Sequence, residues 1–253
     1  MCLIAFAWMP EYERCLVLAA NRDEFHQRPA GPLAWWPEPL DCLAGRDLKA
    51  GGTWLAVARN GRWAAVTNFR DPGAPTGTAS RGDLPLAFLR GDSSPADCVA
   101  SAYARRADYG PFNFLAGDRN SLWYAGSRAR PQAVQPGLHA LSNGLLDQAW
   151  PKSRRATTAL GGLLAGANEI DPDRLFDLLD DREPASDEEL PDTGIGLEAE
   201  RMLSPPFIVS SGYGTRSSTV LSLGTEILAA ERRFAGNGQT LGELCYRYAR
   251  VDL

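Results

Sequence analysis

The fold is decided by residues 1–24, which read MCLIAFAWMPEYERCLVLAANRDE. Two apolar runs, residues 2–8 and 14–20, flank a short polar segment that contains Pro10. Apolar runs of this length joined by a turn predict a β-hairpin. The second run leads into the polar tetrad NRDE at residues 21–24, so four polar side chains directly follow a buried strand.

The rest of the chain predicts more hairpins with helices between them. Asn60-Gly61 separates two apolar runs and is the strongest short hairpin signal in the sequence. Ser80 and Ser94 are suited to cap helices. Further strands are predicted at 53–58, 62–67, 112–116, 122–125, 139–142, 207–211, 217–223 and 227–234, and helices at about 81–90, 95–106, 152–165 and 172–181.

This order predicts a layered α+β fold, because strands that arrive as hairpins favour antiparallel sheets over a βαβ series. Helices inserted between hairpins are suited to cover the outer faces of two stacked sheets. We see no linker or internal repeat and expect a single domain over residues 1–253. The acidic stretch at 184–206 is expected to be either a lid or binding loop, or a surface excursion.

Composition excludes several classes of protein. The formal net charge is −5, which argues against a nucleic-acid partner. No apolar run reaches the length of a membrane span. The five cysteines are scattered without a C-x-x-C pair, which indicates free thiols and no metal site. With no signal-peptide pattern either, we expect a cytoplasmic protein that needs no metal or other cofactor.

Cys2 is the strongest candidate for a catalytic residue. Cysteine is small enough for the usual removal of Met1, which would place a thiol and a free α-amino group on one residue. The α-amine has a pKa of about 7.7–8.0 and can act as a general base, while the thiolate is a good nucleophile. The alternative is that Cys2 is merely a small apolar residue of the first strand.

Three polar clusters favour the chemical role. The first is the tetrad at 21–24, whose guanidinium group can lower the pKa of a nearby thiol. The others are Thr67-Asn68 and Ser142-Asn143-Gly144, each at the end of a predicted strand. Asparagine side chains and backbone N–H groups are suitable donors to an oxyanion.

These clusters and further motifs follow one another along almost the whole chain. Their order resembles that of the NRDE family, also called the transport and Golgi organisation 2 family. The resemblance implies the four-layer αββα sandwich of the N-terminal nucleophile (Ntn) hydrolases, similar to penicillin V acylase and bile salt hydrolase. Such enzymes cleave non-peptide C–N amide bonds with an N-terminal cysteine. The motifs are Met1-Cys2, the tetrad at 21–24, Thr67-Asn68, Ser80-Arg81-Gly82, residues 141–144, residues 190–194 and residues 213–218.

The resemblance also implies a role for each matching residue. Cys2 would be nucleophile and base, with Arg22 and Asp23 setting the states of its thiol and amine. The predicted site further comprises Asn68 through its backbone N–H and Asn143 through its side chain as oxyanion donors, Arg216 in the charge network, and Glu24, Trp54 and Arg81 as substrate contacts.

One departure leaves an alternative open. The acylases separate their arginine and aspartate, whereas Arg22 and Asp23 are adjacent. Neighbouring side chains of a strand point to opposite faces, so both face Cys2 only if the chain turns there. Either Asp23 or Glu24 would then be the partner of the Cys2 amine.

Two functions are therefore predicted. The first is a cysteine amidase that acts on a small amide substrate. The alternative is a carrier of haem or of a lipid or acyl-CoA-like ligand on the same scaffold, with Cys2, His26 and His139 as candidate haem ligands. A homo-oligomer is possible in either case. The tryptophans at 35, 36 and 54 either pack the core or line an apolar pocket for an acyl group.

Overall fold

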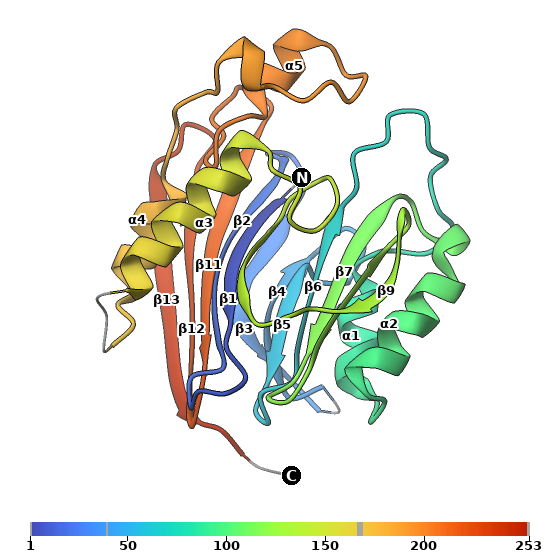
Figure 1. The fold of residues 1–253 in the computed structure, drawn as a ribbon, viewed down its shortest axis with the longest axis vertical. Coiled ribbons are helices and arrows are strands. Elements are labelled where there is room, and N and C mark those ends of the chain that lie inside the picture. Colours follow the sequence, from blue (N-terminus) through green and yellow to red (C-terminus); the bar gives the residue numbers. More distant parts are fainter. Residues whose placement is uncertain (1, 39, 166–168, 252–253) are drawn as a thin grey trace.

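The computed structural model describes residues 2–38, 40–165 and 169–251. Two antiparallel sheets lie face to face (Figure 1). The first contains, in spatial order, β10 (Gly137–Leu141), β1 (Cys2–Trp8), β2 (Leu16–Phe25), β11 (Tyr213–Leu223), β12 (Glu226–Phe234) and β13 (Thr240–Ala249). The second contains β3 (Ala30–Trp36), β4 (Cys42–Asp47), β5 (Leu55–Ala58), β6 (Trp63–Asn68), β7 (Phe112–Gly117), β8 (Leu122–Gly126) and β9 (Ala129–Ala133).

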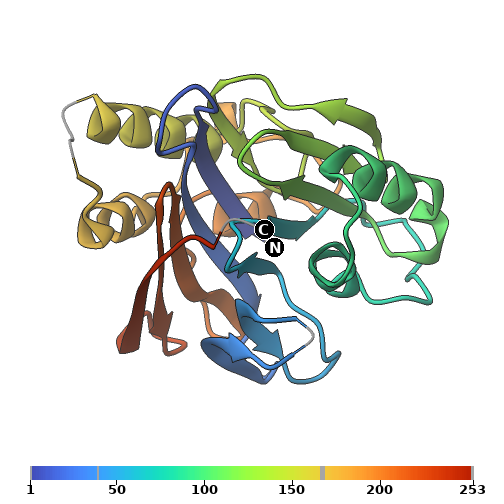
Figure 2. The ribbon, with the colours of Figure 1, turned by 90° about the horizontal axis from the view of Figure 1, so that it is seen from below.

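Helices cover the outer face of each sheet, as Figure 2 shows from below. The helices α3 (Pro151–Leu164) and α4 (Pro172–Leu179) pack on the first sheet, and α1 (Asp83–Arg90) and α2 (Pro95–Ala104) pack on the second. Short helical turns at Arg106–Asp108 and Asp187–Glu189 and the helix α5 (Leu197–Met202) lie in connections. The predicted four-layer αββα sandwich is therefore confirmed.

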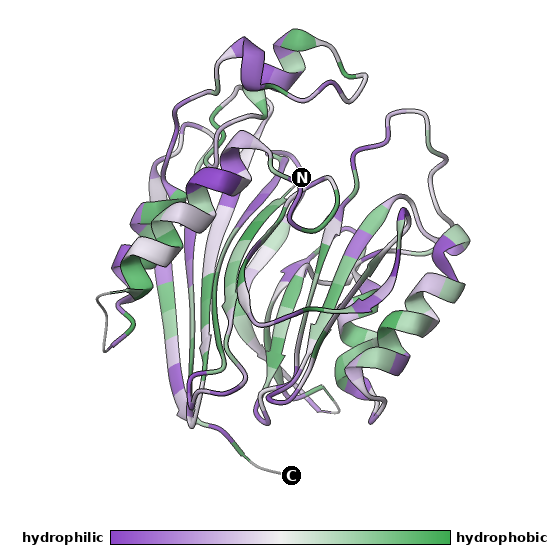
Figure 3. Cartoon of the chain, in the orientation of Figure 1, coloured by the Kyte–Doolittle hydropathy of each residue, from purple (hydrophilic) through white to green (hydrophobic). Residues whose placement is uncertain are grey.

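Alternation along β1 explains the layers. Ile4, Phe6 and Trp8 belong to the core between the two sheets, whereas Leu3 and Ala5 belong to the core beneath α3 and α4. Both faces of the strand are thus buried, and the strands carry hydrophobic residues along much of their length (Figure 3). No helix among the described residues is both long and apolar enough to cross a membrane.

The second strand is longer than predicted. β2 continues through the whole tetrad to Phe25, because β11 supplies a partner for it on the side away from β1. Asn21 is buried and its Nδ2 donates to the carbonyls of Leu179 and Pro206, at 3.0 and 2.9 Å. Polar residues remain in this strand because neighbouring segments satisfy their hydrogen bonds.

Other boundaries also differ from the prediction. The segment 29–40, to which no element was assigned, contains β3, whose alternate half-burial and Pro32 hide it from hydrophobic patterns. β13 was missed because it is an edge strand with alternately exposed side chains. β4 and β9 were missed as well. Residues 207–211 form only an isolated bridge from Val209 to Gly214, and the acidic loop at 184–206 contains α5.

Gly45 in β4 gives the Trp54 ring its position. A methyl group on Gly45 would overlap that ring directly. We predict that Gly45→Ala lowers the free energy of unfolding by about 1–3 kcal/mol through overpacking, measured by urea denaturation. Gly162→Ala is the control, because that helical position has open space and alanine there should stabilise the protein by about 0.5–1 kcal/mol. Equal effects of both substitutions would contradict the prediction.

The turn after β10 is held by His139, whose Nδ1 lies 2.7 Å from Asp147 Oδ2. Burial alone would lower the pKa of His139, but the hydrogen bond and charge of Asp147 raise it above its usual value. A raised pKa means that the folded state binds the proton more tightly. The stabilisation is therefore complete below about pH 6.5 and is lost as the pH rises through the folded-state pKa.

We therefore predict that Asp147→Asn lowers the melting temperature more at about pH 5.5 than at about pH 9. Asparagine suits this position because Asp147 has a positive φ of 60° and its Oδ1 accepts from Ala140 N, a bond that an amide oxygen can keep. A difference in melting temperature that is independent of pH would show that the ion pair contributes nothing.

Candidate active site

Cys2 opens into a cavity of about 480 Å³ between the two sheets. The residue begins β1, and its backbone pairs with Arg22 of β2. Cys2 lies two positions before Ile4 and is therefore on the same face of the strand, toward the second sheet. Arg22, Trp54, Asn68 and Arg81 line the cavity as well, so the structure brings these predicted residues together with Cys2.

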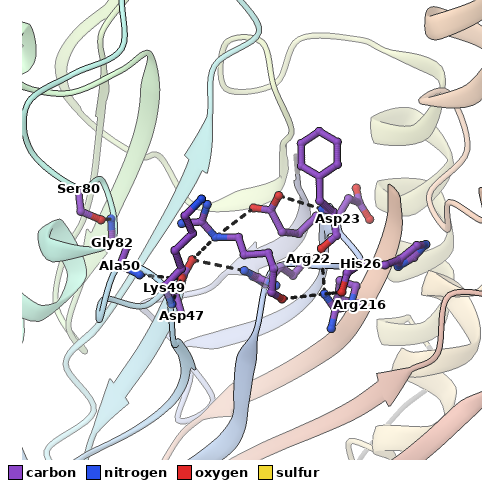
Figure 4. A network of polar contacts seen from close by, with 12 residues as sticks. Arg22, Asp23, His26, Asp47, Lys49, Ala50, Ser80, Gly82 and Arg216 are labelled. Carbon is purple, nitrogen blue, oxygen red and sulfur yellow. Dashed lines mark hydrogen bonds and ion pairs between the residues drawn. The ribbon is translucent and has the colours of Figure 1, made fainter. Parts of the chain in front are cut away.

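Arg22 is held on the cavity wall by two contacts. Its guanidinium group lies 4.2 Å from the centroid of the Trp54 ring, and its Nη2 is 3.6 Å from Asp47 Oδ2. Arg28 Nε lies 2.6 Å from the same carboxylate oxygen and 3.8 Å from Glu24 Oε2 (Figure 4). Figure 4 shows the Arg22 and Asp47 side chains pointing toward one another.

Asp47 and Arg28 were not identified from the sequence. Burial alone would raise the pKa of Asp47, but the Arg28 hydrogen bond and charge, with backbone N–H donors from Ala50 and Lys49, hold it below its usual value. Asp47 is therefore a permanent anion at neutral pH. Sequence analysis missed it because a lone aspartate at the end of an unrecognised strand carries no local signal.

The environment of the Cys2 thiol is mixed. Burial raises the pKa of the thiol, and the negative charge of Asp23 acts in the same direction. The Arg22 charge and the backbone N–H of Asp23 oppose this shift by favouring the thiolate. Since burial prevails, the thiol needs a base to remove its proton at neutral pH.

β2 continues through Arg22 and Asp23 without a turn, so their side chains point to opposite faces of the strand, and Asp23 also contributes to the cavity lining. Asp23 Oδ1 accepts a 2.7 Å hydrogen bond from Thr215 Oγ1 of β11. Burial raises the pKa of Asp23, while the charge of Lys152 on α3 is the strongest influence that lowers it. Glu24 lines the cavity beside Arg22, as expected for the next residue on that face.

Hydrogen bonds between the sheets hold the main chain of Cys2. Ser142 Oγ donates to the Cys2 carbonyl at 3.0 Å, and Thr67 Oγ1 donates to the Ser142 carbonyl at 2.7 Å. Asn113 Nδ2 donates to Gly144 O at 2.9 Å and is itself oriented by Tyr124 OH at 2.8 Å. Asn113 was missed as part of the site, although a buried asparagine within an apolar strand is a usable signal.

Two predicted site residues lie outside the cavity lining. Asn143 is fully buried, and its Nδ2 donates to the Asn68 carbonyl at 2.9 Å. Its amide therefore fixes the Asn68 peptide group. Arg216 Nη1 donates to the carbonyls of Phe25, His26 and Arg28, at 3.0–3.1 Å, and so holds the turn after β2 (Figure 4).

The candidate haem ligands are separated from one another. His26 Nε2 lies 2.9 Å from Ser210 O, and both ring nitrogens of His139 are bonded, to Asp147 and to Gln135 O. Neither histidine lines the cavity of Cys2. Within residues 2–38, 40–165 and 169–251, no group of three or more His, Cys, Asp or Glu residues is arranged to hold a metal ion.

Solved structures share the overall fold. A mutant of the conjugated bile acid hydrolase from Clostridium perfringens aligns with a TM-score of 0.54 over 100% of this chain and 98% of that chain, at 9% identity. The N-acylethanolamine-hydrolyzing acid amidase ortholog of Caenorhabditis elegans aligns with a TM-score of 0.51 over 87% and 92% of the two chains, at 11% identity. At such identities the likeness shows an Ntn-hydrolase-like fold alone.

Sequence relatives are closer. The Transport and Golgi organization protein 2 homolog of Bos taurus is 30% identical over 96% of this chain and 96% of its own length. The homolog of Homo sapiens is 31% identical over 87% of this chain and 88% of its own length. A family model described as Transport and Golgi organisation 2 matches residues 1–234. The chain therefore belongs to the Transport and Golgi organisation 2 family.

Proposed function

We propose that the protein is a cysteine amidase that hydrolyses the C–N bond of a small amide, with Cys2 as its nucleophile after Met1 is removed. The observation that carries the proposal is the position of Cys2, at the start of a central strand and in the lining of a cavity with Arg22. The two solved structures of similar fold are named as an acid amidase and a conjugated bile acid hydrolase, which supports this class of reaction.

The α-amine of Cys2 is the base that the site requires. Burial raises the pKa of the thiol, so the thiolate does not form readily by itself. An α-amine with a pKa of about 7.7–8.0 is partly unprotonated near neutral pH and can accept the proton, and it is attached to the same residue. Removal of Met1 therefore converts a protected thiol into a nucleophile with its own base.

The backbone N–H of Asn68 is the proposed oxyanion donor. Phe69 N donates to Pro111 O, which makes that residue pair a hydrogen-bonded one in the β6–β7 ladder. Asn68, one residue earlier, consequently directs its N–H and C=O away from β7. Asn143 Nδ2 donates to the C=O of Asn68, which anchors the following peptide group and so restrains the Asn68 backbone beside the cavity.

The reaction then proceeds in two steps, which are acylation of Cys2 and hydrolysis of the resulting thioester. The Cys2 thiol transfers its proton to the α-amine, and sulfur attacks the amide carbon to form a tetrahedral oxyanion. Collapse breaks the C–N bond, the amine product leaves with the proton from the α-ammonium group, and a thioester remains. Water, deprotonated by the α-amine, attacks the thioester, releases the carboxylic acid and restores the thiol.

The alternative of a haem or acyl-CoA-like ligand carrier remains a prediction. It would use the same cavity, but no contact among the described residues favours it, since His26 and His139 are bonded to other groups and do not line the cavity. Two of the three tryptophans named above differ in their surroundings. Trp54 lines the cavity, whereas Trp36 is buried against the helix-covered face of the second sheet.

We predict that the purified protein lacks Met1, that iodoacetamide alkylates Cys2 faster than Cys98, and that it hydrolyses some member of a panel of small N-acyl amides. Cys2→Ala should lower this hydrolysis by at least about a thousandfold, because the nucleophile is lost. Intact mass and peptide mapping measure the first two results, and product release measures the third. Cys245→Ser is the control, since Cys245 is exposed on β13. Hydrolysis that survives in Cys2→Ala would refute the proposal.

A further inference from the structure

Lys152 is a buried cation that has no role in the reaction proposed above. It is one of only two lysines in the sequence. It lies in the first turn of α3 and is 2% exposed, and its Nζ has no hydrogen-bond partner among the described residues. The positive end of the helix dipole and the burial both oppose a cation at this position. Neither local helix stability nor solvation therefore explains its presence.

Groups from several elements surround Lys152. Asp23 on β2 and Cys2 on β1 act on it electrostatically, as do Arg70 in the loop after β6 and Glu200 on α5. Arg70 Nη1 and Glu200 Oε2 lie 2.5 Å apart and so neutralise one another. Asp23 is the group that most favours the charged form of Lys152.

The two charges stabilise each other. Burial lowers the pKa of Lys152 to about 8, with Asp23 opposing that shift. Burial also raises the pKa of Asp23, and Lys152 is the strongest influence in the opposite direction. Tyr213 on β11 also faces this group, and burial raises its pKa so far that it stays neutral. Lys152 and Asp23 thus each favour the charged form of the other.

We propose that Lys152 is a positioning residue for Cys2: its buried ammonium group, balanced by Asp23, promotes loss of the proton from the Cys2 thiol and, once Met1 is removed, from the Cys2 α-ammonium group. This inference rests on the proposed function, because it concerns how the nucleophile is activated. A nearby positive charge favours the deprotonated form of both groups, so both effects have the same sign.

The test is the rate at which iodoacetamide alkylates Cys2 as a function of pH, which needs no substrate. Lys152→Met removes the charge and keeps much of the side-chain volume. We expect the pH midpoint of alkylation to rise by about one unit or more, which slows alkylation about tenfold near pH 7. Lys152→Arg retains the charge and should stay within a few tenths of a unit of the wild-type midpoint. Alkylation of the exposed Cys245 should be the same in all variants.

A second neutral variant guards against misfolding. Lys152→Gln removes the charge but still offers an amide N–H donor to the buried Asp23 carboxylate. The cost of losing the lysine partner is therefore smaller than with methionine. The same upward shift is expected, with folding checked by circular dichroism. An unchanged or lowered midpoint in a folded neutral variant overturns the inference. Its failure is distinguishable from failure of the proposed function, because amide hydrolysis and Met1 removal are read independently of the midpoint.

Discussion

The structure depends on one constraint, the pairing of β2 with β1 on one side and β11 on the other. This pairing keeps the tetrad at 21–24 in an extended strand inside a sheet, where neighbouring side chains must point to opposite faces. A turn in the same place would have exposed these residues to water. Because the strand continues, each polar side chain instead meets a partner supplied by another element.

Two separate charge systems follow from this alternation. On the cavity face, Arg22 stacks on Trp54 and approaches Asp47. On the opposite face, Asp23 bonds to Thr215 and is influenced by Lys152 beneath α3. Cys2 lies at the end of the neighbouring strand and feels both systems. Different residues therefore control the charge on the two faces of one strand.

At the site the two sheets are joined by polar contacts as well as by apolar packing. Thr67 of the second sheet bonds to the carbonyl of Ser142, which in turn bonds to Cys2 in the first sheet. Buried hydrogen bonds of this kind stabilise little in net terms, but breaking one leaves a costly unsatisfied group. They therefore fix the relative position of the sheets at the cavity, where a small displacement would separate Cys2 from Asn68.

The sequence alone determined the layered antiparallel fold and the family and made Cys2 the candidate nucleophile, because hydrophobic period, turn residues and ordered motifs are local signals. It also indicated that Arg22 and Asp23 cannot share a face of a strand. Only the tertiary structure decided that the strand continues, that the Asn143 amide holds Asn68, and that Lys152, read from sequence as part of a helix, is buried and interacts electrostatically with Cys2. The reason is physical: the partners come from distant segments, as with Asp23 and Thr215, 192 positions apart, and no local pattern records them.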